Sequence, residues 1–124
     1  MKIEFTETFF MHSIGWRLEV WKLKEINDDF IEKTKSRYGD CIEFSLNECS
    51  DVYSGTSSEL KGEKVIVIVY DGRDFVLVHE LIHAMWHFSR HSGVEMNHDS
   101  QEWQAILFEH LYRHCMTKSN WKVL

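Results

Sequence analysis

The run Val65-Ile66-Val67-Ile68-Val69 constrains the fold of this chain more than any other segment. Five consecutive β-branched residues favour an extended strand, and the lack of alternation with polar residues predicts that both faces of the strand are buried. The chain has 124 residues and is 44% hydrophobic and 14% aromatic, which is enough for one modest core. We therefore expect residues 1–124 to form a single domain with this strand inside its sheet.

Weaker patterns predict the elements around this strand. Alternating or β-rich segments predict further strands near residues 3–11, 16–23 and 42–46. Apolar residues at helical spacing predict helices near residues 25–37, 75–91 and 100–116. The polar, Gly-containing residues 48–63 predict a loop. The expected fold is α+β, with a mixed or antiparallel sheet of three to four strands packed on the last two helices.

Charge and cysteine content restrict the class of partner. The formal net charge is −6, which disfavours binding to the phosphate backbone of nucleic acid. No apolar stretch reaches the length of a membrane span or a signal peptide. The three cysteines form no Cys-x-x-Cys pair, so we expect neither a disulfide framework nor a cysteine zinc knuckle. A cytoplasmic protein that binds neither nucleic acid nor membrane is expected, with its oligomeric state open.

The segment His79-Glu80-Leu81-Ile82-His83 carries the chemistry. On a helix, positions i and i+4 differ by about 40° around the axis, so both imidazoles project from one face and can share one Zn²⁺ ion. Glu80 lies roughly 100° from His79, where it can reach a metal-bound water without being a ligand. On a helical wheel, the two histidines lie at the edge of a wide apolar arc, and Glu80 lies just past them. Trp86 belongs to this arc, so we expect it in the core or at its rim. Two ordinary surface histidines are the alternative reading.

A catalytic zinc site needs a third protein ligand and leaves its fourth position to water. Glu102, in the first turn of the last predicted helix, is the favoured third ligand. His98, fifteen residues after His83, and Glu109 are the alternatives. Glu102 also fits a structural role, because Asp99 as N-cap would place it at the third position of a capping box.

His79-Glu80-x-x-His83 followed by Glu102-x-x-Ala105 resembles the gluzincin branch of the zincin metallopeptidases. Residues 64–115 are similar to small zincin-like proteins of phages and, through His87 and Phe108 as well, to the ImmA/IrrE group. The resemblance implies a small zincin-like domain with an active-site helix and a glutamate-bearing helix, located in the host cytoplasm if phage-encoded. Two departures stand out. Ile106 replaces the aspartate of the thermolysin-like pattern, and Ser89 replaces the third histidine of the metzincin pattern.

The sequence therefore predicts a zinc-dependent, metallopeptidase-like hydrolase with a protein or peptide substrate. His79, His83 and Glu102 would hold one zinc ion, and Glu80 would activate a zinc-bound water for attack on a peptide carbonyl. The first alternative is a non-catalytic zincin-fold module that binds zinc and a host or regulatory protein. The second is a metal-free interaction protein with an accidental motif. A DNA-linked protease similar to the SprT group is disfavoured by the acidic charge.

Overall fold

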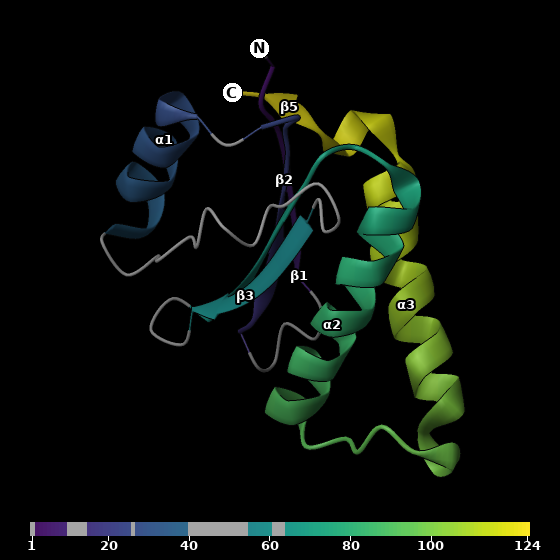
Figure 1. Ribbon diagram of the computed structural model, residues 1–124. Helices are drawn as coiled ribbons and strands as arrows, with labels where there is room; N and C mark the ends of the chain where they lie inside the picture. Colours follow the sequence, from purple (N-terminus) through teal and green to yellow (C-terminus); the bar gives the residue numbers. More distant parts are fainter. Residues whose placement is uncertain (1, 10–14, 26, 40–54, 61–63) are drawn as a thin grey trace.

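The computed structural model describes residues 2–9, 15–25, 27–39, 55–60 and 64–124. These residues form an α+β fold in which one mixed sheet separates two helices from a third (Figure 1). The strands are β1 (Glu4–Phe9), β2 (Arg17–Lys22), β3 (Gly55–Leu60), β4 (Val65–Tyr70) and β5 (Lys122–Val123). The helices are α1 (Asp28–Tyr38), α2 (Asp74–Ser92) and α3 (Gln101–Met116), with short 3-10 turns η4 (His98–Ser100) and η5 (Lys118–Asn120).

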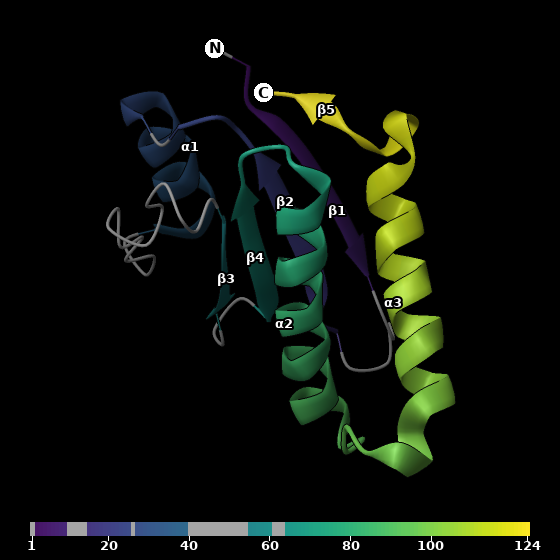
Figure 2. The same cartoon turned by 45° about the vertical axis from the view of Figure 1, so that its right-hand side comes forward.

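The sheet has the strand order β3-β4-β2-β1-β5. β2 and β4 pair in parallel, and every other neighbouring pair is antiparallel. On one face, α2 lies over β3 and β4 while α3 lies over β1 (Figure 2). The expected α+β class and the mixed sheet packed on two helices are confirmed. The described sheet has four six-residue strands and the two-residue β5, and β3 and β5 were not among the three to four strands expected.

Apolar cores lie on both faces of the sheet. β4 is therefore buried along its entire length. Toward α2 and α3, Leu18 and Val20 of β2 pair in register with Ile66 and Ile68 of β4. Toward α1, Trp21 packs edge-on against Phe30 at 5.5 Å between ring centroids. The expectation that residues 65–69 are buried on both faces is confirmed.

A buried carboxylate fixes α1 to the sheet. Glu19 of β2 is fully buried, and Arg37 donates to it from Nε at 2.8 Å. The Tyr38 hydroxyl also donates to Glu19, and Trp21 Nε1 donates to that hydroxyl at 3.0 Å. Burial, reinforced by the Glu19 charge, raises the pKa of Tyr38, which keeps the hydroxyl protonated as a donor. The charge of Glu19 is thus paired and hydrogen-bonded inside an otherwise apolar layer.

Three predictions about local structure need correction or fall outside the described residues. The predicted loop 48–63 contains β3, whose partner β4 supplies the pairing that local composition does not show. The predicted strand 42–46 lies outside the described residues. The first helix begins later than expected, at Asp28, because the Asn27 side chain caps it by accepting from the backbone of Phe30. None of the helices in the described part of the chain is long and apolar enough to cross a membrane.

Candidate metal centre

The predicted metal ligands of α2 lie on a helix with well-defined ends. The helix begins at Asp74, and among the described residues no side chain makes a capping hydrogen bond to its N-terminus. At the other end, Gly93 adopts a left-handed conformation with φ 77° and donates to the Ser89 carbonyl. Only glycine enters this region without strain, so the helix ends there. Leu77, Leu81, Ala84 and Phe88 anchor the helix to the sheet.

His79 and His83 lie side by side on the exposed face of α2. Their Nε2 atoms are 3.2 Å apart, and the ring planes are inclined by 70°. Two imidazoles that bind one zinc at about 2.0–2.1 Å with tetrahedral angles hold their nitrogens about 3.3–3.4 Å apart. The observed separation is close to the one that a shared zinc ion requires. The His79 side chain is 56% exposed, so a ligand can approach from solvent.

Glu80 is inside the protein, which corrects the helical-wheel placement. It was expected just past the edge of the apolar arc, but only 5% of the residue is exposed. Its Oε1 lies 4.0 Å from His79 Nε2. Within the described part of the chain, the carboxylate has no hydrogen-bond partner. A buried carboxylate without such a partner is costly in free energy, which makes it a strong candidate for a functional group.

Burial and neighbouring histidines shift the pKa values of Glu80 and His83. Burial raises the pKa of Glu80, and the neighbouring His79 opposes that rise. Burial lowers the pKa of His83, and the nearby His79 and His87 lower it further. His83 is therefore neutral at physiological pH, and its free ring nitrogen can bind a cation.

The structure does not bring a third ligand to the two histidines. Among the described residues, no group of three or more His, Cys, Asp or Glu side chains is placed to hold a metal ion. α3 runs antiparallel to α2, and Gln101 near its start lines the same groove as Trp86. Glu102, in the first turn of α3, is exposed and is not part of such a group.

Glu102 differs from its expected capping geometry. Asp99 is not an N-cap. Asn97 is the N-cap of η4, where its side chain accepts from the backbone nitrogens of Asp99 and Ser100, and Ser100 is the N-cap of α3. Ser100 completes the capping box, so Glu102 has no capping role to explain it. His98 lies in η4, where its Nδ1 accepts from the Gln101 side chain.

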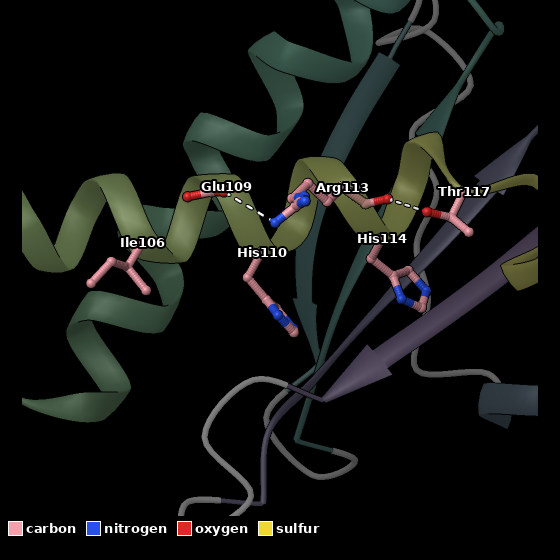
Figure 3. A pocket seen from close by; sticks show the side chains of 6 residues that line it. All are labelled: Ile106, Glu109, His110, Arg113, His114 and Thr117. Carbon is pink, nitrogen blue, oxygen red and sulfur yellow. Dashed lines mark hydrogen bonds and ion pairs between the residues drawn. The ribbon is translucent and has the colours of Figure 1, made fainter.

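Glu109, the other alternative ligand, faces a separate groove on α3. That groove has a volume of 460 Å³, and α2 contributes nothing to its lining (Figure 3). It is lined by Ile106, Glu109, His110, Arg113, His114 and Thr117. Glu109 accepts there from Arg113 at 3.2 Å. Deeper in the fold, Thr6 donates to the Asn120 carbonyl at 2.7 Å, so its oxygen accepts from His114 Nε2 at 2.8 Å. His114 thus ties α3 to β1, a role that its sequence neighbours did not reveal.

The apolar arc of α2 is narrower than the sequence predicted. Trp86 is 57% exposed and Ile82 is 46% exposed, so the expectation that Trp86 lies in the core or at its rim is wrong. The reason is tertiary, because the sheet covers the side of the helix that carries Leu77, Leu81 and Phe88. The histidines lie on the open side of α2, next to these exposed apolar residues.

Comparison of the chain with family models, with curated proteins and with solved structures finds no significant match. The zincin resemblance therefore has the motif residues as its support. The geometry of His79, Glu80 and His83 is the structural basis for a function of this site.

Proposed function

We propose that this protein is a zinc-dependent, metallopeptidase-like hydrolase that acts on a protein or peptide substrate. The observation that supports it best is the buried Glu80 carboxylate, 4.0 Å from one of two imidazoles whose Nε2 atoms are 3.2 Å apart. A structural zinc site has no need of an adjacent buried base, whereas a hydrolytic site does. The resemblance to the zincin metallopeptidases points to the same reaction class.

The residues of α2 divide the work between binding and proton transfer. His79 and His83 would hold the zinc ion from the solvent-exposed side of the helix. A bound zinc ion supplies Lewis-acid activation of water and of a carbonyl group. Glu80 would accept the proton released from the attacking water and deliver it to the leaving amine. Burial serves this role, since a raised pKa brings the carboxylate closer to the operating pH of a general base.

Glu102 is proposed as the third ligand, with His98 and Glu109 as the alternatives. Glu102 does not form a metal-binding group with His79 and His83 in the described structure, so binding zinc would require the first turn of α3 to move toward them. Matched variants distinguish the three residues, namely Glu102→Gln, His98→Gln and Glu109→Gln. The variant of the true ligand should weaken zinc binding by about 100-fold or more, while the other two remain close to the unmodified protein.

The function is tested by replacing Glu80 with Gln and measuring zinc and hydrolysis separately. We expect the Glu80→Gln variant to retain near-unit zinc by elemental analysis and to lose cleavage of a defined peptide mixture analysed by mass spectrometry. Glu32→Gln, an exposed position on α1, is the matched control and should retain both. Unchanged hydrolysis in Glu80→Gln would refute the assignment. Unit zinc without hydrolysis in the unmodified protein would favour the non-catalytic zinc module, and absence of zinc would favour the metal-free interaction protein.

A further inference from the structure

A histidine side chain connects the segment after α3 to the sheet. This segment contains η5 and the two-residue strand β5, which pairs with β1 (Figure 2). Thr6 of β1 donates to the Asn120 carbonyl of η5 at 2.7 Å and accepts from His114 Nε2 at 2.8 Å. On the other side of the ring, His114 Nδ1 lies 3.3 Å from the side-chain nitrogen of Asn120. That nitrogen also donates to the His114 carbonyl at 3.0 Å. We call Thr6, His114 and Asn120 the His114 latch.

The hydrogen bonds of the His114 latch require a neutral imidazole. The Thr6 hydroxyl gives its single proton to a carbonyl, so the proton between Thr6 and Nε2 belongs to the ring. A neutral imidazole is protonated on one nitrogen only, which leaves Nδ1 as an acceptor for the Asn120 amide. In the protonated ring both nitrogens are donors, and the Nδ1 proton would meet an amide proton. Turning the amide over does not repair this, because its oxygen would then face the His114 carbonyl.

We propose that protonation of His114 opens the latch and releases β5 from β1, which makes this segment a pH-sensitive device of the fold. Release leaves the edge of β1 at Glu4 and Phe5 without its partner strand. An unpaired strand edge can accept another strand. The proposal depends neither on zinc nor on hydrolysis, since the His114 latch is formed by β1, α3 and η5.

The other attachments of β5 are weak. Its pairing with β1 covers two residues, and Leu124 adds a backbone hydrogen bond to the Ile3 carbonyl at 2.9 Å. Val123 and Leu124 are 58% and 42% exposed, so little apolar burial opposes their release. Trp121 is the stronger anchor, because it packs on the core and its Nε1 donates to the Cys115 carbonyl at 2.8 Å. We therefore expect the residues beyond Trp121 to be the ones that lose order.

Burial and a neighbouring histidine keep His114 neutral. Burial lowers the pKa of His114, and His110, one turn earlier in the same groove, lowers it further (Figure 3). A hydrogen bond with the backbone of Glu7 opposes this decrease. The folded state therefore binds the proton less tightly than the unfolded chain, in which the pKa of histidine is about 6.5. The latch is closed above this pH, and its contribution to stability is lost as the pH falls below it.

The charged side chains of the neighbouring elements do not favour a charged ring. In the groove, Glu109 is paired with Arg113 at 3.2 Å between oxygen and nitrogen. Glu7 of β1 is likewise paired, since its carboxylate accepts from the arginine of α1. Lys118 of η5 and Lys122 of β5 are both positive, so they disfavour a further positive charge nearby.

The proposal is tested by nuclear magnetic resonance of metal-free protein between pH 7.5 and pH 5. We expect the heteronuclear NOE of residues 122–124 to fall with the same midpoint as the titration of the His114 ring, below a pH of about 6.5. His114→Gln does not titrate and should remove this change. His110→Gln is the matched control, because it alters a histidine of the same groove outside the latch, and it should retain the transition at a slightly higher pH.

A second variant should reverse the effect of acid. Asn120→Asp places a carboxylate beside Nδ1, where it accepts from the protonated ring. We expect it to raise the pKa of His114 by about one unit or more and to keep residues 122–124 ordered at pH 5.

Three results would overturn the His114 latch. The first is unchanged order of residues 122–124 while the His114 ring titrates. The second is an equal loss of order in His114→Gln or in Asn120→Asp. The third is loss of the β2 and β4 amide signals over the same pH range, which would mean that acid unfolds the whole protein and does not release β5 alone.

Discussion

Replacing His83 with Gln should remove the thermal stabilisation that zinc gives to this protein. The two Nε2 atoms are 3.2 Å apart, close to the separation of about 3.3–3.4 Å expected around a tetrahedral zinc ion. Because the fold brings the two rings together, zinc should bind the folded state in preference to the unfolded chain and so stabilise it. Gln cannot substitute, since its amide lacks the basic ring nitrogen that coordinates the metal.

The expected magnitude follows from linkage. Free zinc at 100 times its Kd stabilises a protein by about 2.7 kcal/mol. A chain of 124 residues has an unfolding entropy of about 0.26 kcal/mol/K, so the Tm should rise by about 10 °C. If His83→Gln weakens binding 100-fold, the same zinc concentration gives about 0.4 kcal/mol, which is a shift of less than about 2 °C.

The assay is a thermal melt of metal-free protein with and without added zinc, followed by circular dichroism. His87→Gln is the matched control, because it removes a histidine one turn further along α2 and should keep nearly the full zinc shift. The reasoning would be refuted by an unmodified protein that zinc does not stabilise. It would also be refuted if His83→Gln and His87→Gln responded to zinc equally.

Other predictions concern the stability of the scaffold. Leu81 is fully buried, so Leu81→Ala should destabilise the fold by about 3–5 kcal/mol in urea unfolding. Ile82→Ala, at the half-exposed neighbouring position, should change the free energy of unfolding little. Equal losses in the two variants would contradict the burial pattern. Arg37→Met leaves the buried Glu19 carboxylate without its main cation and should cost about 2–3 kcal/mol, while retained stability would show that the remaining donors suffice. Burial raises the pKa of Cys115 to about 12. The folded state therefore holds its proton more tightly than the unfolded state, and stability present below pH 9 is lost as the pH rises toward 12. Between pH 8 and pH 11, the free energy of unfolding should fall by about 2–3 kcal/mol more in the unmodified protein than in Cys115→Ala. Equal decreases in the two proteins would contradict this.

The amino-acid sequence alone determined the features that depend on local periodicity. The β-branched run 65–69 predicted a strand buried on both faces, and β4 is that strand. Helical spacing predicted a helix near residues 75–91, and α2 spans Asp74–Ser92. The i,i+4 relation of His79 and His83 predicted that their rings meet, and they do. Backbone geometry decides each of these, so neighbouring residues carry enough information.

Only the tertiary structure decided the features that depend on which neighbours cover each element. The strand β3 was assigned to a loop, because its pairing with β4 is not encoded in its own polar composition. A helical wheel places Glu80 and Trp86 relative to each other, but it does not say which side meets the sheet. Glu80 is buried and Trp86 is 57% exposed, which reverses both expectations. Whether α3 brings a third ligand to the two histidines likewise depends on how the two helices pack along one another. Contacts between residues far apart in the chain set this packing, so sequence spacing does not predict it.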